Sequence, residues 1–190
     1  MENAVVSKHI KRICPVEGAG GLDNSIRKWL QSPQKILRPY ITEGMTALDI
    51  GCGPGFFSLE MARMVGKSGR VIAADMQEGM LQIVKEKIKG TKLQERIVLH
   101  KCGENNIGVS ERVDFVLLFY MVHEVPNKEH FFNEIGTILK PHGQILIVEP
   151  PFHVSKSAFE ETIRIAGEAE LIVIGRPKMF FSRAVLLKKA

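Results

Sequence analysis

Residues 45–55, MTALDIGCGPG, decide the fold of this chain because they join a short apolar run to three glycines on alternate positions. The run from Ala47 to Ile50 is typical of a strand buried on both faces. The glycines, Gly51, Gly53 and Gly55, allow positive φ and close approach of a ligand to the backbone. Helical spacing follows directly, so the N–H groups of a helix start should face the turn and favour a carboxylate or phosphate. The stretch predicts a nucleotide-type cofactor site at the first strand of an open α/β sheet.

The bulk composition is that of one ordinary globular domain. The chain has 190 residues, 45% hydrophobic and 25% charged. Its net charge of +5 is small, and the basic residues are scattered over expected helix surfaces. We therefore do not expect a nucleic-acid partner, and the sequence leaves a homodimer open.

The cysteine count and the apolar runs bear on location. The three cysteines form no CxxC pair and give an odd number, which indicates a reducing compartment. No apolar run reaches the length of about 18 residues that a membrane span needs. The first residues contain no apolar h-region of a secretory signal. We expect a cytoplasmic protein with no membrane span.

The first 44 residues precede the sheet and are predicted to form an N-terminal helical lid, with residues 45–190 as the main domain. GAGG at 18–21 is typical of a flexible hinge. An apolar stripe from Leu22 to Leu30 predicts one helix, and Ser32 followed by Pro33 predicts the start of a second.

From residue 45 onward, strands and helices alternate at short spacing. The later strands are expected at 70–76, 96–102, 113–121, 143–150, 170–174 and 181–187. The last two are joined by six residues, 175–180, too few for a helical crossover, so this pair should be antiparallel. The pattern predicts a doubly wound, seven-stranded mixed sheet with helices on both faces and a C-terminal antiparallel hairpin. A capping box of Ser157 and Glu160 is expected at the last helix.

Two acidic residues flank the glycine turn and favour one class of cofactor over another. Asp75 ends the second strand, where a carboxylate can accept hydrogen bonds from ribose hydroxyls, cap the next helix, or do both. A nicotinamide site normally shows G-x-G-x-x-G, but Phe56 holds the place of the third glycine here. Asp49 would repel a pyrophosphate and suits an ammonium group instead. A tight turn without a ligand is the alternative.

With these features, the chain resembles the class I S-adenosylmethionine-dependent methyltransferases. The resemblance covers about residues 45–190 and looks most like the type-11, ubiquinone-biosynthesis-like branch. Its motifs are LDIGCGPGFFS at 48–58, the acid at Asp75, VDFVLLFYMVHEVPN at 113–127 and LKPHGQILIVEP at 139–150.

The resemblance implies S-adenosylmethionine as the cofactor and assigns residues to its parts. Asp49, Gly51 and Gly53 would hold the methionine end, in a turn completed by Cys52 and Gly55. Asp75 would bind the ribose, and Met76 would cover one face of the adenine. Family members often carry an acid after the third strand that meets the adenine amino group. Gly103 occupies that place here, so the contact falls to Glu104 or to backbone.

Methyl transfer is an in-line displacement, so the protein must align the acceptor and remove its proton. Tyr120, His123 and Glu124 follow the predicted central strand, at the mouth of the crevice. His123 is the candidate general base because its ordinary pKa is near neutral. A loop histidine packed on the next helix is the alternative. Glu149, at the end of the fifth strand, is expected to bind substrate, or else to be a surface carboxylate or a partner of basic leader residues.

Together these observations predict a Rossmann-like methyltransferase that uses S-adenosylmethionine. The fourth strand is not followed by the N/D-P-P-Y/F segment with which base methyltransferases grip a flipped base, so the substrate should be a small molecule. A nicotinamide-dependent oxidoreductase and a non-catalytic cofactor-binding partner subunit are the alternatives. No metal site is predicted.

Overall fold

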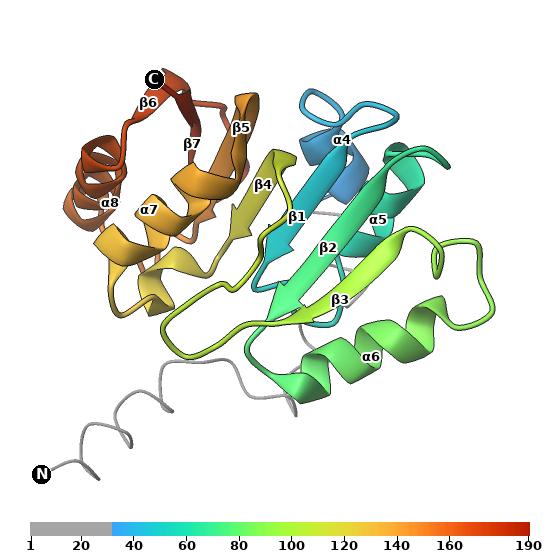
Figure 1. Cartoon of the computed structure of the whole chain (residues 1–190). Coiled ribbons are helices and arrows are strands. Elements are labelled where there is room, and N and C mark those ends of the chain that lie inside the picture. The colour runs from blue at the N-terminus through green and yellow to red at the C-terminus, as the bar shows by residue number, and fades with distance from the viewer. Residues whose placement is uncertain (1–31) are drawn as a thin grey trace, which may run out of the picture.

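The structure is a computed structural model that describes residues 32–190. A seven-stranded sheet runs through it in the order β3-β2-β1-β4-β5-β7-β6, with helices on both faces (Figure 1). This confirms the predicted fold. The predicted hinge at 18–21 and the apolar stripe that follows lie outside the described residues, and the lid they would form stays a prediction.

The elements fall close to the predicted positions. The strands are β1 (Thr46–Ile50), β2 (Arg70–Asp75), β3 (Ile97–Lys101), β4 (Val113–Phe119), β5 (Leu139–Glu149), β6 (Leu171–Gly175) and β7 (Arg183–Lys189). The helices are α4 (Pro33–Leu37), α5 (Ser58–Met64), α6 (Glu78–Ile88), the short 3-10 helix η2 (Val122–Glu124), α7 (Lys128–Ile138) and α8 (Lys156–Glu168). None of the helices within 32–190 combines the length and the apolar character needed to cross a membrane.

The direction of the strands fixes where a ligand can bind. β1 lies between β2 and β4 and is parallel to both. β5 is parallel to β4 and antiparallel to β7, which in turn pairs antiparallel with β6. The order of the strands therefore reverses beside β1, and in open α/β sheets ligands bind outside the carboxyl ends of the strands at such a point.

The core consists of two apolar layers, one on each face of the sheet. Along β4, Phe115 and Leu117 join the layer of α4, α5 and α6, whereas Val116 and Leu118 join the layer of α7 and α8. This alternation follows from the two-residue period of a strand. Because both faces are covered, β4 is almost entirely apolar, which is why it gave the strongest strand signal in the sequence.

The segment just before the sheet is part of the core. α4 begins at Pro33, as the sequence predicts. Leu37 and Ile41 are buried in the α5 layer, and the ring of Tyr40 stacks on Phe115 at 5.9 Å between centroids. Residues 33–41 are thus fixed against the sheet.

Two local predictions were wrong. α8 is capped by Ser155, whose Oγ accepts a hydrogen bond from the N–H of Ala158, and not by a capping box of Ser157 and Glu160. The carboxylate of Glu160 instead pairs with Arg176, at 2.7 and 2.8 Å. β5 also begins earlier than predicted, at Leu139, because a register shift accommodates the turn-like residues at 141–143 inside the strand.

Candidate active site

The glycine turn after β1 is closed by its own backbone hydrogen bonds. The N–H groups of Gly51 and Cys52 donate to the carbonyl of Ala74 in β2, at 2.8 and 3.0 Å. The N–H of Gly53 donates to Asp75 Oδ2 at 2.9 Å, and that of Gly55 donates to the Cys52 carbonyl. The sequence predicted that the N–H groups of the helix start face the turn. The four N–H groups named here belong to the turn itself and are used within the chain, and α5 begins only at Ser58.

The three glycines serve different purposes. A Cβ atom at Gly51 would lie 3.0 Å from the Cβ of Met121, and one at Gly55 would lie 2.6 Å from Leu59 Cδ1. These two glycines permit close packing, and both have positive φ. At Gly53 nothing lies within 4 Å of the Cβ position. Gly53 is therefore the open part of the turn, where a ligand can approach the backbone.

Asp75 joins the glycine turn to the start of α6. Its Oδ1 accepts from the N–H of Gln77 at 2.8 Å, and its Oδ2 accepts from Gly53. Burial raises the pKa of this carboxyl, and the backbone hydrogen bonds counter that effect. A carboxylate has about four lone-pair sites. Asp75 thus supports the helix start, as the sequence allowed, and keeps acceptor capacity for ligand hydroxyls.

Asp49 is a buried carboxyl with no cationic side chain among the groups that shift its pKa. It is 2% exposed and accepts a hydrogen bond from Ser58 Oγ at 2.5 Å. Burial raises its pKa to about 7, Ser58 lowers it, and the charge of Asp75 raises it further. A positively charged group beside Asp49 would stabilise the ionised form. This residue therefore fits the ammonium group of a ligand.

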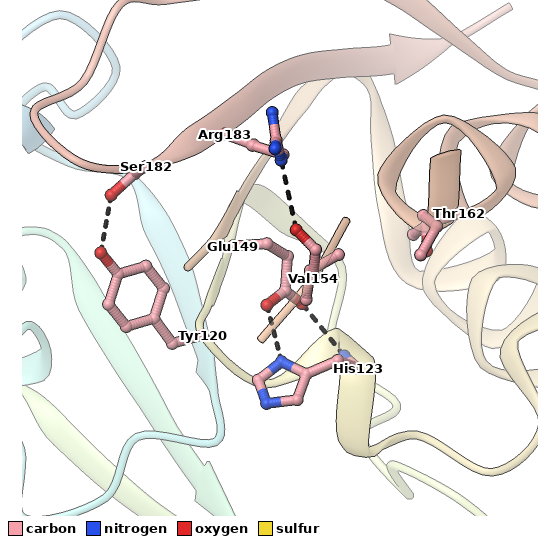
Figure 2. Close-up of polar contacts among 8 residues, drawn as sticks. Tyr120, His123, Glu149, Val154, Thr162, Ser182 and Arg183 are labelled. Carbon is pink, nitrogen blue, oxygen red and sulfur yellow. Dashed lines mark hydrogen bonds and ion pairs between the residues drawn. The ribbon is translucent and has the colours of Figure 1, made fainter. Parts of the chain in front are cut away.

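On the opposite side of the crevice, Glu149 holds His123 (Figure 2). Its Oε1 accepts the backbone N–H of His123 at 3.0 Å, and its Oε2 lies 2.7 Å from Nδ1 of the ring. Because a carboxylate only accepts, the ring proton sits on Nδ1 and Nε2 is left as an acceptor. The hydrogen bond to Glu149 raises the pKa of His123 against the effect of burial.

The position of Glu149 differs from one of the interpretations its sequence allowed. It is 1% exposed, so it is not a surface carboxylate. Each of its oxygens accepts one hydrogen bond from His123, and its contact with substrate stays a prediction. The geometry makes Glu149 a residue that positions His123.

Tyr120 ends β4 in a strained conformation. Its φ is 60°, in the left-handed region that non-glycine residues seldom adopt. Its hydroxyl lies 2.6 Å from Ser182 Oγ, in the turn before β7 (Figure 2). Ser182 was not predicted as a site residue, because an isolated serine in a turn carries no pattern.

Glu124 completes a negatively charged crevice. Burial raises its pKa to about 7, the charge of His123 lowers it, and the charges of Glu149 and Asp75 raise it. Asp75 also acts on Asp49, so the carboxylates of the two sides influence one another. The four carboxyl groups thus form a coupled row from Asp49 to Glu149, with His123 and Lys128 at the Glu149 end, and the excess of negative charge attracts a cationic ligand.

Comparison with known proteins agrees with this geometry. The profile of a family described as a methyltransferase domain matches residues 41–171. This chain belongs to that family. It is 28% identical to a SAM-dependent methyltransferase of Aquifex aeolicus of known structure, with a TM-score of 0.83 over 93% of this chain and 100% of that one. A methyltransferase structure from Methanococcus maripaludis, described as putative, is 21% identical over 92% of this chain and 93% of that one, with a TM-score of 0.73, and shows the fold alone.

The curated relatives match this chain over only part of their own length. A demethylmenaquinone methyltransferase of Lactobacillus johnsonii is 33% identical over 110 residues, which are 57% of this chain and 45% of that protein. One from Bacillus cereus is 26% identical over 123 residues, 65% of this chain and 51% of that protein. The chain therefore spans about half the length of the curated relatives it matches.

The remaining predicted site residues of this methyltransferase domain line the same edge of the sheet. Cys52 is 6% exposed and its thiol faces the Gly53 carbonyl at 3.5 Å. Burial raises its pKa well above the ordinary value, so it is an unreactive thiol. Met76 is 40% exposed after β2, and Gly103 and Glu104 are exposed after β3. Their contacts with adenine stay predictions.

The domain also contains a small hollow beside His123 that the sequence did not indicate. Its volume is about 160 Å³, and Lys128, His153 and Thr162 bound it together with His123. The rings of His123 and His153 lie 6.0 Å apart. His123 lies in η2, Lys128 at the start of α7, His153 in the loop before α8 and Thr162 in the middle of α8, so the packing of α7 against α8 brings them together.

Proposed function

We propose that this chain is an S-adenosylmethionine-dependent methyltransferase that acts on a small-molecule acceptor. The observation that carries the proposal is the buried carboxyl pair Asp49 and Asp75 beside the glycine turn, together with a histidine after β4 that a buried glutamate holds. Membership of the methyltransferase domain family and the likeness to the Aquifex aeolicus enzyme support it.

The residues around the glycine turn fit the chemical groups of S-adenosylmethionine. S-adenosylmethionine, when bound, supplies an electrophilic methyl group on a positively charged sulfonium. Asp49 would pair with the ammonium group, and the open face of Gly53 would admit the methionine end. Asp75 would accept from the ribose hydroxyls, and Met76 would cover the adenine, with Gly103 or Glu104 at its edge.

The acceptor side supplies a base. His123 Nε2 takes a proton from the acceptor, which frees the acceptor's electrons to attack the methyl group. Glu149 keeps Nδ1 protonated, orients the ring and stabilises the imidazolium that forms. Tyr120, fixed by Ser182, and Glu124 would border the acceptor, where they can donate or accept hydrogen bonds.

The names of the curated relatives indicate which acceptor to test first. The curated relatives are named demethylmenaquinone methyltransferases, so the reduced form of demethylmenaquinone is the first acceptor to test. A net charge of +5 without a basic cluster argues against nucleic acid. The odd number of cysteines supports a cytoplasmic, reducing location.

Two other functions make different predictions. A nicotinamide-dependent oxidoreductase would have to place a pyrophosphate beside Asp49, where like charges repel. A non-catalytic partner subunit would bind the cofactor without turning over an acceptor. The geometry of His123 and Glu149 supports an enzyme, because Glu149 orients the ring and leaves Nε2 as an acceptor for a proton.

Calorimetric titration tests the proposal. S-adenosylmethionine, its demethylated product and NADH are titrated into the native chain and into Asp75→Ala. We expect micromolar binding of the first two ligands and a loss of about 10- to 100-fold in the variant, since a hydrogen bond to a charged group contributes about 1.5–3 kcal/mol. Asp114→Ala is the control, because Asp114 binds Lys140 and the N–H of Thr46 at the opposite end of β4.

The outcomes separate the three functions. Binding of NADH alone would contradict the proposal. Binding of S-adenosylmethionine with no methylation of demethylmenaquinol or other small acceptors would favour the partner subunit. An equal loss in Asp114→Ala would show that the Asp75 effect is structural.

A further inference from the structure

Three phenylalanine side chains stand out from the surface at the end of β5 and in the turn before β7. Phe152, Phe180 and Phe181 are 81%, 59% and 60% exposed, more than any other large apolar side chain in 32–190. The rings of Phe152 and Phe181 stack at 6.1 Å between centroids, and Phe180 meets Phe181 edge-on at 4.5 Å. We call these three residues the phenylalanine cluster. Contiguous exposed apolar surface of this kind is often functional.

The pairing of two strands places the phenylalanine cluster at the rim of the active site. β5 and β7 are antiparallel, and their last pair on this edge is Glu149 with Arg183. Phe152 follows Glu149 by three residues, a span of at most about 11 Å. Phe181 precedes Ser182, whose hydroxyl binds Tyr120. Both parts of the phenylalanine cluster are therefore attached to residues of the candidate site.

The phenylalanine cluster is held in place by the surrounding structure. Arg183 Nε donates to the carbonyl of Val154 at 3.2 Å and so ties the loop of Phe152 to β7 (Figure 2). Met179 and Ser182 form a β-bridge that closes the turn. Phe181 has a φ of 45°, a left-handed conformation that costs a bulky residue energy. The fold keeps this ring outward despite that cost.

We propose that the phenylalanine cluster binds a flat, apolar ring system of the methyl acceptor and so directs the acceptor's reacting group toward His123. The proposal rests on the proposed function and specifies its substrate class. Aromatic rings bind flat rings by offset and edge-on packing, which is the arrangement that the three side chains already have among themselves.

The position of the surface, and not its size, argues for the methyl acceptor. Aromatic side chains bury roughly 150–250 Å² each, so the exposed part of the phenylalanine cluster is on the order of 400 Å². A standard protein interface buries about 800 Å² on each partner, of which roughly 450 Å² is apolar, so the area alone fits a second copy of the chain as well as a small ring. The cluster is attached to Glu149 on β5 and to Ser182 before β7, at the candidate site, and this placement favours the acceptor.

The test uses 2-naphthol as the probe and the full chain as the protein. Its binding is measured by calorimetry and by ligand-observed NMR for the native chain, for Phe152→Ser/Phe181→Ser, and for Ile172→Ser/Ile174→Ser. The last variant removes exposed apolar side chains, 44% and 40% exposed, from β6 and serves as the matched control. We expect at least a tenfold loss of 2-naphthol affinity in the phenylalanine variant and less than twofold in the control.

Parallel titration with S-adenosylmethionine separates the two proposals. An unchanged affinity for S-adenosylmethionine in the phenylalanine variant shows that the fold is intact and supports the assignment. Equal 2-naphthol binding in all three proteins, or none in the native chain, would overturn it. Cluster-dependent 2-naphthol binding in a native chain that does not bind S-adenosylmethionine would overturn the proposed function and leave the ring-binding surface.

Other occupants of the surface give distinct results. A native dimer that becomes monomeric in Phe152→Ser/Phe181→Ser by analytical ultracentrifugation would assign the surface to a second copy of the chain. Flotation of the native chain, but not of that variant, with phosphatidylglycerol vesicles would assign it to a membrane surface. Either result would overturn the acceptor assignment.

Discussion

Two carboxyl groups of the crevice, Asp49 and Glu149, are buried to the same degree but have different partners. They are 2% and 1% exposed, at the ends of β1 and β5. Glu149 binds an imidazole from its own chain through both oxygens. Among residues 32–190, Asp49 has only the hydroxyl and N–H of Ser58 as hydrogen-bond donors, and burial raises its pKa to about 7. The Glu149 side of the crevice is therefore complete without a ligand, whereas the Asp49 side needs a cation from outside.

The largest expected effect comes from removing the imidazole on the complete side. His123→Ala should lower kcat by about 10²- to 10⁴-fold, the range for loss of a general base. The affinity for S-adenosylmethionine should stay within about twofold, because we propose that the cofactor binds on the Asp49 side. Steady-state kinetics and calorimetry measure the two quantities. His153→Ala is the control, since His153 borders the same hollow without contacting Glu149. An equal kcat loss in both variants would show that the hollow, and not the base, matters.

A smaller effect, with a specific pH signature, is expected when Glu149 loses its charge. Glu149→Gln should lower kcat about 10- to 100-fold, because the ring loses the partner that fixes its proton on Nδ1. The carboxylate raises the pKa of His123, so the native pH profile should rise at a pH above 6.5. In the variant this rise should move to lower pH. A profile that keeps its native position would contradict the positioning role, even if kcat falls.

The same shift has a consequence for stability. Because folding raises the pKa of His123, its charged form stabilises the native state fully below pH 6.5, and this contribution is lost as the pH rises through the folded value. Glu149→Gln should lack this dependence. Urea unfolding between pH 5 and pH 9 measures it.

The smallest effect concerns Asp49, the carboxyl without a cation. Its pKa rises from 3.8 to about 7 on folding, so the cost of its charge grows from about pH 4 and is complete above about pH 7. Asp49→Asn should therefore stabilise the ligand-free protein at pH 8 and leave it unchanged at pH 4. Urea unfolding measures both.

The variant also tests what Asp49 is for. S-adenosylmethionine should bind the native chain more tightly as the pH rises from 6 to 8, because Asp49 must ionise to pair with the ammonium group. Asp49→Asn should bind it at least tenfold more weakly and without that pH dependence. Unchanged cofactor affinity in a stabilised variant would show that Asp49 is a structural residue.

The cofactor side was largely predictable because its information is local. Strand periodicity, the glycine spacing and Asp75 place one β-α-β unit, and a single unit brings Asp49, Gly53 and Asp75 together. What the sequence could not predict there is the use of the N–H groups. Their use depends on where α5 begins. In the turn, the N–H groups donate hydrogen bonds to the carbonyl of Ala74 and the carboxylate of Asp75.

The acceptor side needed the tertiary structure. His123 and Glu149 are 26 residues apart in the sequence, and Tyr120 and Ser182 are 62 residues apart. In each pair, the two residues come from different parts of the fold. The sequence predicted Tyr120, His123 and Glu149 one at a time. The pairing of β5 with β4 and β7 determines that the carboxylate of Glu149 contacts the ring of His123. The phenylalanine cluster follows from the same pairing.

The sequence by itself determined the order of strands and helices, the antiparallel end of the sheet and the glycine turn, because periodicity and turn chemistry act over a few neighbouring residues. Only the tertiary structure decided which polar groups are buried and with what partners. Burial and strand register are properties of the whole sheet, and they give Glu149 its histidine and leave Asp49 without a cation.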